Sequence, residues 1–391
     1  MKIKKVLMFH GTDMCYNTLN IFSESVAECM RKRGIDVRFI DMYLPEDDLI
    51  KEFLSAMDMD YDVAIAFNSQ GQEKLDIGVP VYNWLVDHPA EHLPSIRETI
   101  ENYNVICVDR DHVNFVRRYF PNVSNAIFCP LGGERIKGET DFSFEAFEKR
   151  KYDVIFTGSY TALNDIADSI ENFPGNLSKI CKDLIEVMLD NPAVNTERAL
   201  AGVLRDNNIE YDRNSFPQYM FAVSKATFYL RSYLRERIVR YIADSDLMVD
   251  IFGRGWEDLG DVGNVRLHGP VSHYESVDLC KDARIALNVM PLFKDGLHDR
   301  IPTAMLHGAV SMTDPSQYIM ETFDLSDSEG EIILYDIGHP ELIADKIGTA
   351  LDDHEALYAM ASRGRIKAEN SLTWDKRVEE VIHTIEGQAD R

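Results

Sequence analysis

The sequence has 391 residues, of which 45% are hydrophobic and 27% charged, the balance of an ordinary globular protein. Its formal net charge of −25 argues against a nucleic-acid partner, because phosphate binding needs clustered cations. No segment approaches the roughly 18 uninterrupted apolar residues of a membrane span, and the six cysteines include no Cys-Xaa-Xaa-Cys pair. We therefore expect a cytoplasmic protein with no integral membrane segment.

The first part of the chain alternates short apolar runs with helical patterns. After the first run, Leu19, Phe22, Val26 and Met30 recur at helical spacing, and Gly34 follows as a C-cap. This alternation predicts a parallel sheet covered by helices. The expected strands are 6–9, 37–40, 63–67, 79–82, 105–108 and 126–129.

The second part repeats this organisation around a long helical stretch. YDVIFTGSY (152–160) reads as a strand that runs into a glycine turn, and 164–245 reads as mainly helical, with breaks at Pro174-Gly175 and Asn191-Pro192. Further strands are expected within 248–256, 264–270, 283–291, 308–314 and 331–336. The chain is therefore predicted to contain two α/β domains, with ligands at the carboxyl ends of the strands.

The N-terminus of a predicted helix in the second domain is one candidate ligand site. Pro302 suits the first turn of a helix that Gly308 ends, so Asp299 and Arg300 would lie at its start. The free N–H groups there, together with the Arg300 guanidinium, suit a diphosphate. The alternative is an ordinary capped helix with Arg300 on the surface.

Glycine-bearing loops after three strands are further candidates. Gly253-Arg254-Gly255-Trp256, His268-Gly269 and Gly158-Ser159-Tyr160 could each bring backbone groups close to a ligand. A plain tight turn is the alternative for each, and none has the Gly-Lys-Ser/Thr end of a P-loop.

Polar residues also follow the strands of the first domain. His10 begins His-Gly-Thr-Asp after the first strand, Asp87 follows the fourth and Asp109 the fifth. His10 or Asp87 could act as a base for an acceptor hydroxyl, with Asp87 orienting His10 or replacing it. Capping is the alternative for Asp87, and it is the favoured interpretation of Asp109. His88 and His92 are four residues apart, but no zincin pattern accompanies them, so we predict no metal site.

Several motifs follow one another in order along the second part. They run from YDVIFTGSY and MVDIFGRGW through VRLHGPVSHYESVDLCKDARIALNVMP and GLHDRIPTAMLHGAVSMTDPS to LTWDKRVEEVIHTIE. In this order they resemble the group-1 glycosyltransferase domain of the spore-maturation CgeB-like family. VYNWLVDHP, CVDRDH and IFCPLGGE resemble the family's N-terminal companion domain, so the resemblance covers most of the chain outside 164–245.

This resemblance implies a GT-B fold, with two Rossmann-like parallel-sheet domains facing across a cleft and a helical insertion in the second. An acceptor domain would span 1–145 and a nucleotide-sugar-binding domain 146–370. A helix within 371–391, which has one apolar face, would cross back to the first domain. Arg300 falls on the family's arginine near the diphosphate. The Phe-Glu pair that usually follows is replaced here by Pro302 and Thr303, and in related retaining enzymes a carboxylate in this region binds donor hydroxyls.

We therefore expect a glycosyltransferase that moves a sugar from a nucleotide-diphosphate sugar to an acceptor. The expected nucleotide is uridine diphosphate, and the acceptor would be a glycan, a protein or a small molecule. We expect the reaction to need neither a metal ion nor a cofactor. The expected catalytic residues are His10 and Asp87, although a retaining mechanism needs no such base. The alternatives are a nucleotide-sugar epimerase or hydrolase, and a catalytically silent binding subunit. The expected donor-binding residues are Gly158, Ser159, Tyr160, Gly253, Arg254, Gly255, Trp256, His268, Gly269, Asn288, His298, Asp299, Arg300 and Thr303.

Overall fold

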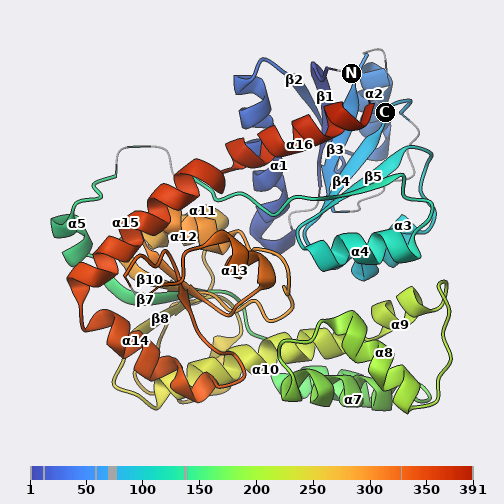
Figure 1. The fold of residues 1–391 in the computed structure, drawn as a ribbon. Coiled ribbons are helices and arrows are strands. Elements are labelled where there is room, and N and C mark those ends of the chain that lie inside the picture. Colours follow the sequence, from blue (N-terminus) through green and yellow to red (C-terminus); the bar gives the residue numbers. More distant parts are fainter. Residues whose placement is uncertain are drawn as a thin grey trace. The chain divides into compact units, whose positions relative to one another are not determined.

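The computed structural model describes residues 2–11, 14–57, 60–68, 77–135, 138, 140–326 and 328–389. The chain forms two compact units (Figure 1). The first contains residues 1–132, 216–218 and 373–391, and the second contains residues 133–215 and 219–372. None of the helices that the structure describes combines the length and apolar character needed to cross a membrane.

The first unit is built on a six-stranded parallel sheet of order β2-β1-β3-β4-β5-β6. β3, β4 and β5 are buried along their whole length, as expected for a parallel sheet covered on both faces. The strands are β1 (Lys5–His10), β2 (Asp36–Asp41), β3 (Val63–Phe67), β4 (Val81–Leu85), β5 (Tyr103–Cys107) and β6 (Asn125–Phe128). The helices are α1 (Met14–Lys32), α2 (Glu46–Met57), η2 (Pro89–His92), α3 (Leu93–Ile96), α4 (Arg110–Tyr119) and α16 (Trp374–Ala389).

Local patterns account for most of these boundaries. α1 ends before Gly34, whose φ of 77° is the left-handed conformation of a C-cap glycine, as predicted. Asp109 caps α4 by accepting the Asp111 N–H at 2.8 Å, which confirms its capping interpretation. The expected strand 79–82 lies too early, because Pro80 cannot donate to the ladder and β4 begins at Val81.

The core of the first unit includes the last helix of the chain. Trp374 at the start of α16 is 3% exposed, and its ring lies 5.1 Å from that of Phe22 and 5.7 Å from that of Trp84. α16, drawn in red in Figure 1, lies along α1. Gly132 makes room for this packing, since a Cβ there would lie 2.5 Å from the Trp374 nitrogen.

The second unit contains another six-stranded parallel sheet, of order β12-β11-β10-β7-β8-β9. This confirms the predicted fold class of two parallel α/β sheets. Its strands are β7 (Tyr152–Thr157), β8 (Val249–Phe252), β9 (Arg266–Leu267), β10 (Ala283–Leu287), β11 (Val310–Thr313) and β12 (Ile333–Leu334).

The helical stretch between β7 and β8 is present as predicted. It comprises α6 (Leu163–Glu171), α7 (Leu177–Asp190), α8 (Thr196–Asp206), α9 (Phe216–Ala222) and the long α10 (Ser224–Ala243). Gly175 has a φ of 59° in the break before α7, and α7 ends just before Asn191. The remaining helices are α5 (Phe144–Glu148), η3 (Trp256–Leu259), α11 (His273–Leu279), η4 (Cys280–Asp282), α12 (Arg300–Leu306), α13 (Gln317–Thr322), η5 (Pro340–Leu342), α14 (Ile343–Leu351) and α15 (His354–Ser371).

The units divide between Gly132 and Gly133, whereas the expected boundary followed residue 145. Residues after Gly132 are tied to the second unit. The Gly133 N–H donates to the Leu372 carbonyl at 2.8 Å, and Phe147 of α5 is 2% exposed in the core of the second unit.

Candidate functional site

The strand order of the second unit places a ligand crevice between β7 and β10. From β7 the chain proceeds to β8 and β9 on one side, and β10, β11 and β12 lie on the other. Loops after neighbouring strands diverge at such a switch point, and ligands of open α/β sheets bind there. The loops that leave it are residues 158–160 after β7 and the segment from Asn288 after β10.

The glycines of two predicted loops serve their mutual packing. The Gly158 N–H donates to the Phe252 carbonyl and the Tyr160 N–H to the Arg254 carbonyl, both at 2.9 Å. A Cβ at Gly253 would lie 2.0 Å from the Gly158 oxygen, and one at Gly255 would lie 2.3 Å from the Tyr160 oxygen. These glycines therefore let the loops approach each other, whereas the expectation was an approach to ligand.

Two aromatic residues expected at the donor lie beneath these loops. Trp256 is 1% exposed, donates to the Gly158 carbonyl at 2.6 Å and stacks on Tyr160 with centroids 5.1 Å apart. The Tyr160 hydroxyl bonds to Glu236, and burial together with that carboxylate raises the pKa of Tyr160. Both rings therefore support the two loops. In the loop after β8, the Arg254 side chain is exposed.

His268 is held by a carboxylate of the neighbouring strand. Its Nε2 lies 2.5 Å from Oδ1 of the buried Asp250, and its ring stacks on Phe252 with centroids 4.4 Å apart. The next residue, Gly269, accepts the Gly253 N–H at 2.8 Å and has a φ of 71°. His268 is thus an oriented, exposed imidazole beside the glycine loops.

Two N–H groups near the start of α12 are engaged locally, which narrows the expected backbone anion site. The Arg300 N–H faces His298 Nδ1 at 3.4 Å, the Ile301 N–H donates to the His298 carbonyl at 3.1 Å, and the Thr303 N–H donates to the Asp299 carbonyl at 3.1 Å. The remaining first-turn residue, Pro302, has no N–H. With the Ile301 and Thr303 N–H groups engaged, side chains are the stronger candidates to hold an anion here.

His298, Asp299 and Arg300 form a charged group at this turn. His298 Nδ1 lies 2.7 Å from Asp299 Oδ1. Burial raises the pKa of Asp299, but His298 and Arg300 lower it more, to about 2, so this carboxylate is ionised. Burial, followed by Arg300, lowers the pKa of His298. Arg300 is half-buried and its Nη1 reaches the Asn288 side-chain oxygen only at 3.4 Å, which leaves the guanidinium available to a ligand.

Thr303 has a structural partner in place of a donor hydroxyl. It is 5% exposed, and its hydroxyl accepts the N–H of the buried Glu134 at 3.1 Å. Asn288 is likewise 2% exposed and donates to the Thr313 hydroxyl at 3.1 Å. The position at which related enzymes carry a carboxylate is therefore used here to hold residues 133–134.

Two arginines that the sequence analysis did not select come to this site from α10. Arg235 donates from Nη1 to the Ser159 carbonyl at 2.8 Å, which places its guanidinium at the end of β7. Burial lowers the pKa of Arg235, and Arg300 and Arg231 lower it further. Arg231 also lowers the pKa of Arg300. In the sequence, Arg231 and Arg235 are four residues apart, and Arg235 lies between the apolar residues Leu234 and Ile238. This pattern could have indicated an arginine that faces inward.

In the first unit, His10 lies at the switch point between β1 and β3. Its Nε2 is 2.9 Å from Glu24 Oε1 on α1, and its ring stacks on Phe39 with centroids 4.1 Å apart. Glu24 was not anticipated, and no motif marks it. Thr12 and Asp13, which complete the His-Gly-Thr-Asp loop, lie outside the described residues.

Asp87 is two strands away from His10 in sheet order and has a different partner. It is exposed, and its Oδ2 accepts from the Asn68 amide at 3.1 Å. It does not cap the following turn, since His88 Nδ1 accepts the Ala90 N–H at 3.1 Å instead. In this structure Asp87 is bonded to Asn68 and His10 lies against Glu24, so Asp87 does not orient the imidazole directly.

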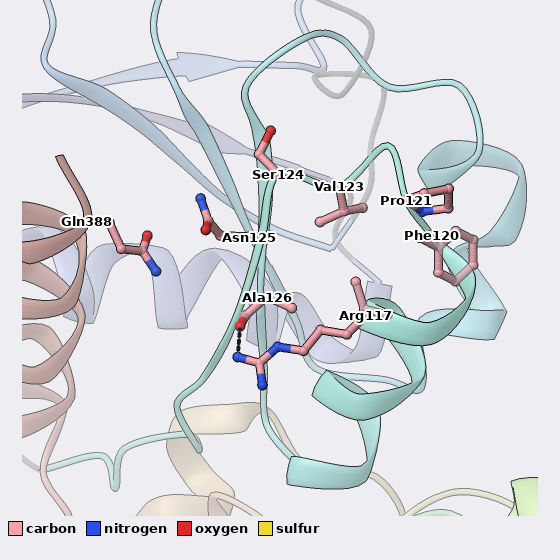
Figure 2. Close-up of a pocket in the computed structure, with 9 residues that line it drawn as sticks. Arg117, Phe120, Pro121, Val123, Ser124, Asn125, Ala126 and Gln388 are labelled. Atoms are coloured by element: carbon pink, nitrogen blue, oxygen red, sulfur yellow. Dashed lines mark hydrogen bonds between the residues drawn. The ribbon is translucent and has the colours of Figure 1, made fainter. Parts of the chain in front are cut away.

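A surface hollow of about 320 Å³ lies at the other end of the first sheet (Figure 2). It is lined by the end of α4, by residues 123–126 and by Gln388, and Arg117 donates to the Ala126 carbonyl at 3.0 Å within it. This hollow adjoins the amino-terminal end of β6. It is therefore separate from the strand ends that carry His10 and Asp87.

Comparisons with known proteins place this arrangement in a class. Residues 231–383 match the family described as glycosyl transferase-like. Sucrose-phosphate synthase from Thermosynechococcus elongatus is similar over 99% of this chain and 99% of its own, with a TM-score of 0.57 and 11% identity. A search of curated protein sequences gave no match.

Two further structures share the architecture. Anabaena HepE, solved in complex with UDP-glucose, is similar over 98% of this chain and 99% of its own, with a TM-score of 0.52 and 12% identity. AviGT4, a glycosyltransferase involved in avilamycin A biosynthesis, is similar over 97% and 96% respectively, with a TM-score of 0.52 and 10% identity.

The fold is therefore that of the GT-B glycosyltransferases, as the sequence predicted. The match of residues 231–383 to the glycosyl transferase-like family agrees with the predicted enzyme class of glycosyltransferase. The narrower resemblance to the CgeB-like family stays a prediction.

Proposed function

We propose that the chain transfers a sugar from a uridine-diphosphate sugar to an acceptor hydroxyl, without a metal ion. The observation that carries this proposal is the Arg300 guanidinium at the switch point between β7 and β10. It is half-buried and forms no salt bridge within the part of the chain that the structure describes. A cation in that position can stabilise a leaving diphosphate as its charge develops. HepE, which has the same fold, was solved with UDP-glucose.

The first experiment measures UDP binding by the shift in melting temperature and by calorimetry. A ligand that binds only the native state stabilises it, by about 2.7 kcal/mol at 100 times its dissociation constant. Arg300→Ala should weaken UDP binding by about 1.5–3 kcal/mol, the value of a hydrogen bond to a charged group. Arg300→Lys should recover only part of this, because lysine lacks the planar fork. Normal UDP binding by Arg300→Ala would remove the donor-site assignment.

A second experiment separates transfer from the two alternative functions. UDP-sugars are incubated with and without a panel of acceptors, and the products are identified. Transfer requires an acceptor, whereas epimerisation and hydrolysis proceed without one. A silent subunit would bind UDP-sugar with no product under either condition, and that result would contradict the proposed transfer.

A further inference from the structure

Asn68 joins the ends of two neighbouring strands in the first unit. It follows β3, and its N–H donates to the Trp84 carbonyl of β4 at 2.9 Å. Its Oδ1 accepts the Val86 N–H at 3.0 Å, and its Nδ2 donates to Asp87 Oδ2 at 3.1 Å. Because a backbone N–H can only donate, Oδ1 must face Val86, and this directs the amide N–H groups toward Asp87.

The backbone of Asn68 adopts an uncommon conformation. Its φ is 52°, in the left-handed region that glycine adopts without strain and that asparagine tolerates better than most residues. Glycine would satisfy the turn, so the backbone alone does not require an amide at this position. Residues held in this region gather at functional sites, where their surroundings fix them. The bond to Val86 serves the turn, whereas the bond to Asp87 needs a separate explanation.

Among the described residues, Asp87 is held by this amide and not by a cation or a helix end. It is exposed after β4 and forms no salt bridge in those parts of the chain. His88 caps the next turn in its place, by accepting the Ala90 N–H. A carboxylate accepts through two oxygens, so one that is oriented by a single amide can also accept from a hydroxyl.

We propose that Asn68 is a positioning residue, which holds the Asp87 carboxylate so that it accepts a hydrogen bond from a hydroxyl of the acceptor. The inference rests on the proposed function and deepens it, because it gives the acceptor a binding residue in the first unit. In sheet order β3 lies between β1, which ends at His10, and β4, which precedes Asp87. The carboxyl ends of these parallel strands share one edge, where ligands of open α/β sheets bind.

The test removes the amide and keeps the backbone conformation. Asn68→Gly retains a residue that readily adopts a positive φ. Asn68→Asp retains an acceptor for the Val86 N–H but places a second carboxylate beside Asp87, where like charges repel. Transfer is measured with the UDP-sugar and the acceptor that give most product in a panel of hexoses, oligosaccharides and serine peptides. Both variants should raise the acceptor KM about tenfold, as expected for a weakened hydrogen bond to a charged group, and should bind UDP with wild-type affinity.

Asn102 provides a matched control in the same unit. It is exposed, has a φ of 61° and directly precedes β5, so it lies at the amino-terminal end of the sheet. Asn102→Gly and Asn102→Asp repeat the two chemical changes away from Asp87, and both should keep the wild-type acceptor KM. The melting temperatures of all four variants show whether each one is folded.

A double-mutant cycle separates positioning from a structural role. If Asn68 acts through Asp87, then Asn68→Gly should change the acceptor affinity little in an Asp87→Asn background. Acceptor affinity is measured by calorimetry with UDP bound, so inactive variants complete the cycle, and Asn68→Asp replaces a glycine variant that does not fold. Equal effects in both backgrounds would overturn the proposal. A lower melting temperature of Asn68→Gly with an unchanged acceptor KM in both Asn68 variants would overturn it as well.

Failure of the proposed function gives a different result. A wild-type protein that binds UDP-sugar but forms no product with any acceptor of the panel contradicts the proposed transfer, and this inference is overturned with it. A wild-type protein that transfers sugar, and whose two Asn68 variants keep the acceptor KM, overturns this inference alone.

Discussion

At the scale of residues, hydrogen-bond partners separate side chains that can meet a ligand from those that support the loops. Trp256, Tyr160 and Thr303 were all expected at the donor, and each is engaged inside the second unit. Arg300 keeps its guanidinium largely unengaged. In the first unit, His10 Nε2 lies 2.9 Å from the Glu24 carboxylate on α1.

The residue-scale prediction concerns His10 as the acceptor base. His10→Ala should lower turnover by roughly 10²–10⁴-fold, the usual contribution of a general base. Its UDP affinity should remain that of the wild-type protein, because the base acts on the acceptor. Steady-state kinetics with a productive donor and acceptor, together with UDP calorimetry, measure both quantities. Unchanged turnover would remove the assignment and favour Asp87 or a retaining mechanism.

At the scale of elements, the ends of β7 and β8 form one packed unit through Gly158 and Gly253. Gly253→Ala should destabilise the protein strongly, because the new Cβ would lie 2.0 Å from a backbone oxygen that cannot easily move. Gly348→Ala in α14 is the matched control. Its Cβ meets nothing within 4 Å, and alanine is about 0.5–1 kcal/mol better than glycine inside a helix. Thermal denaturation of both variants measures the difference, and equal melting temperatures would contradict the close-packing argument.

At the scale of the whole molecule, the chain leaves the first unit at Gly132, contributes residues 216–218 to it, and rejoins it at Thr373. The stability of the N-terminal sheet therefore depends on the last residues of the chain. Trp374→Ala should destabilise the first unit by about 3–5 kcal/mol, the usual cost of truncating a buried aromatic residue. Hydrogen exchange should show lost protection in β1–β6 with β7–β12 little changed. His383→Ala, at an exposed position of α16, should leave both sheets protected, and an equal loss in both sheets of Trp374→Ala would contradict this dependence.

The sequence by itself determined the two parallel sheets, the helical stretch between β7 and β8, and the caps at Gly34 and Asp109. Apolar periodicity and capping act over a few residues, so these features can be read locally.

Only the tertiary structure decided which side chains meet at the site. Arg235 reaches Ser159 across 76 residues, and Glu24 reaches His10 from a neighbouring helix. The N–H groups of α12 looked free in the sequence because their partners depend on how the preceding turn folds. Such partners are chosen by packing between distant segments, which a local pattern does not encode.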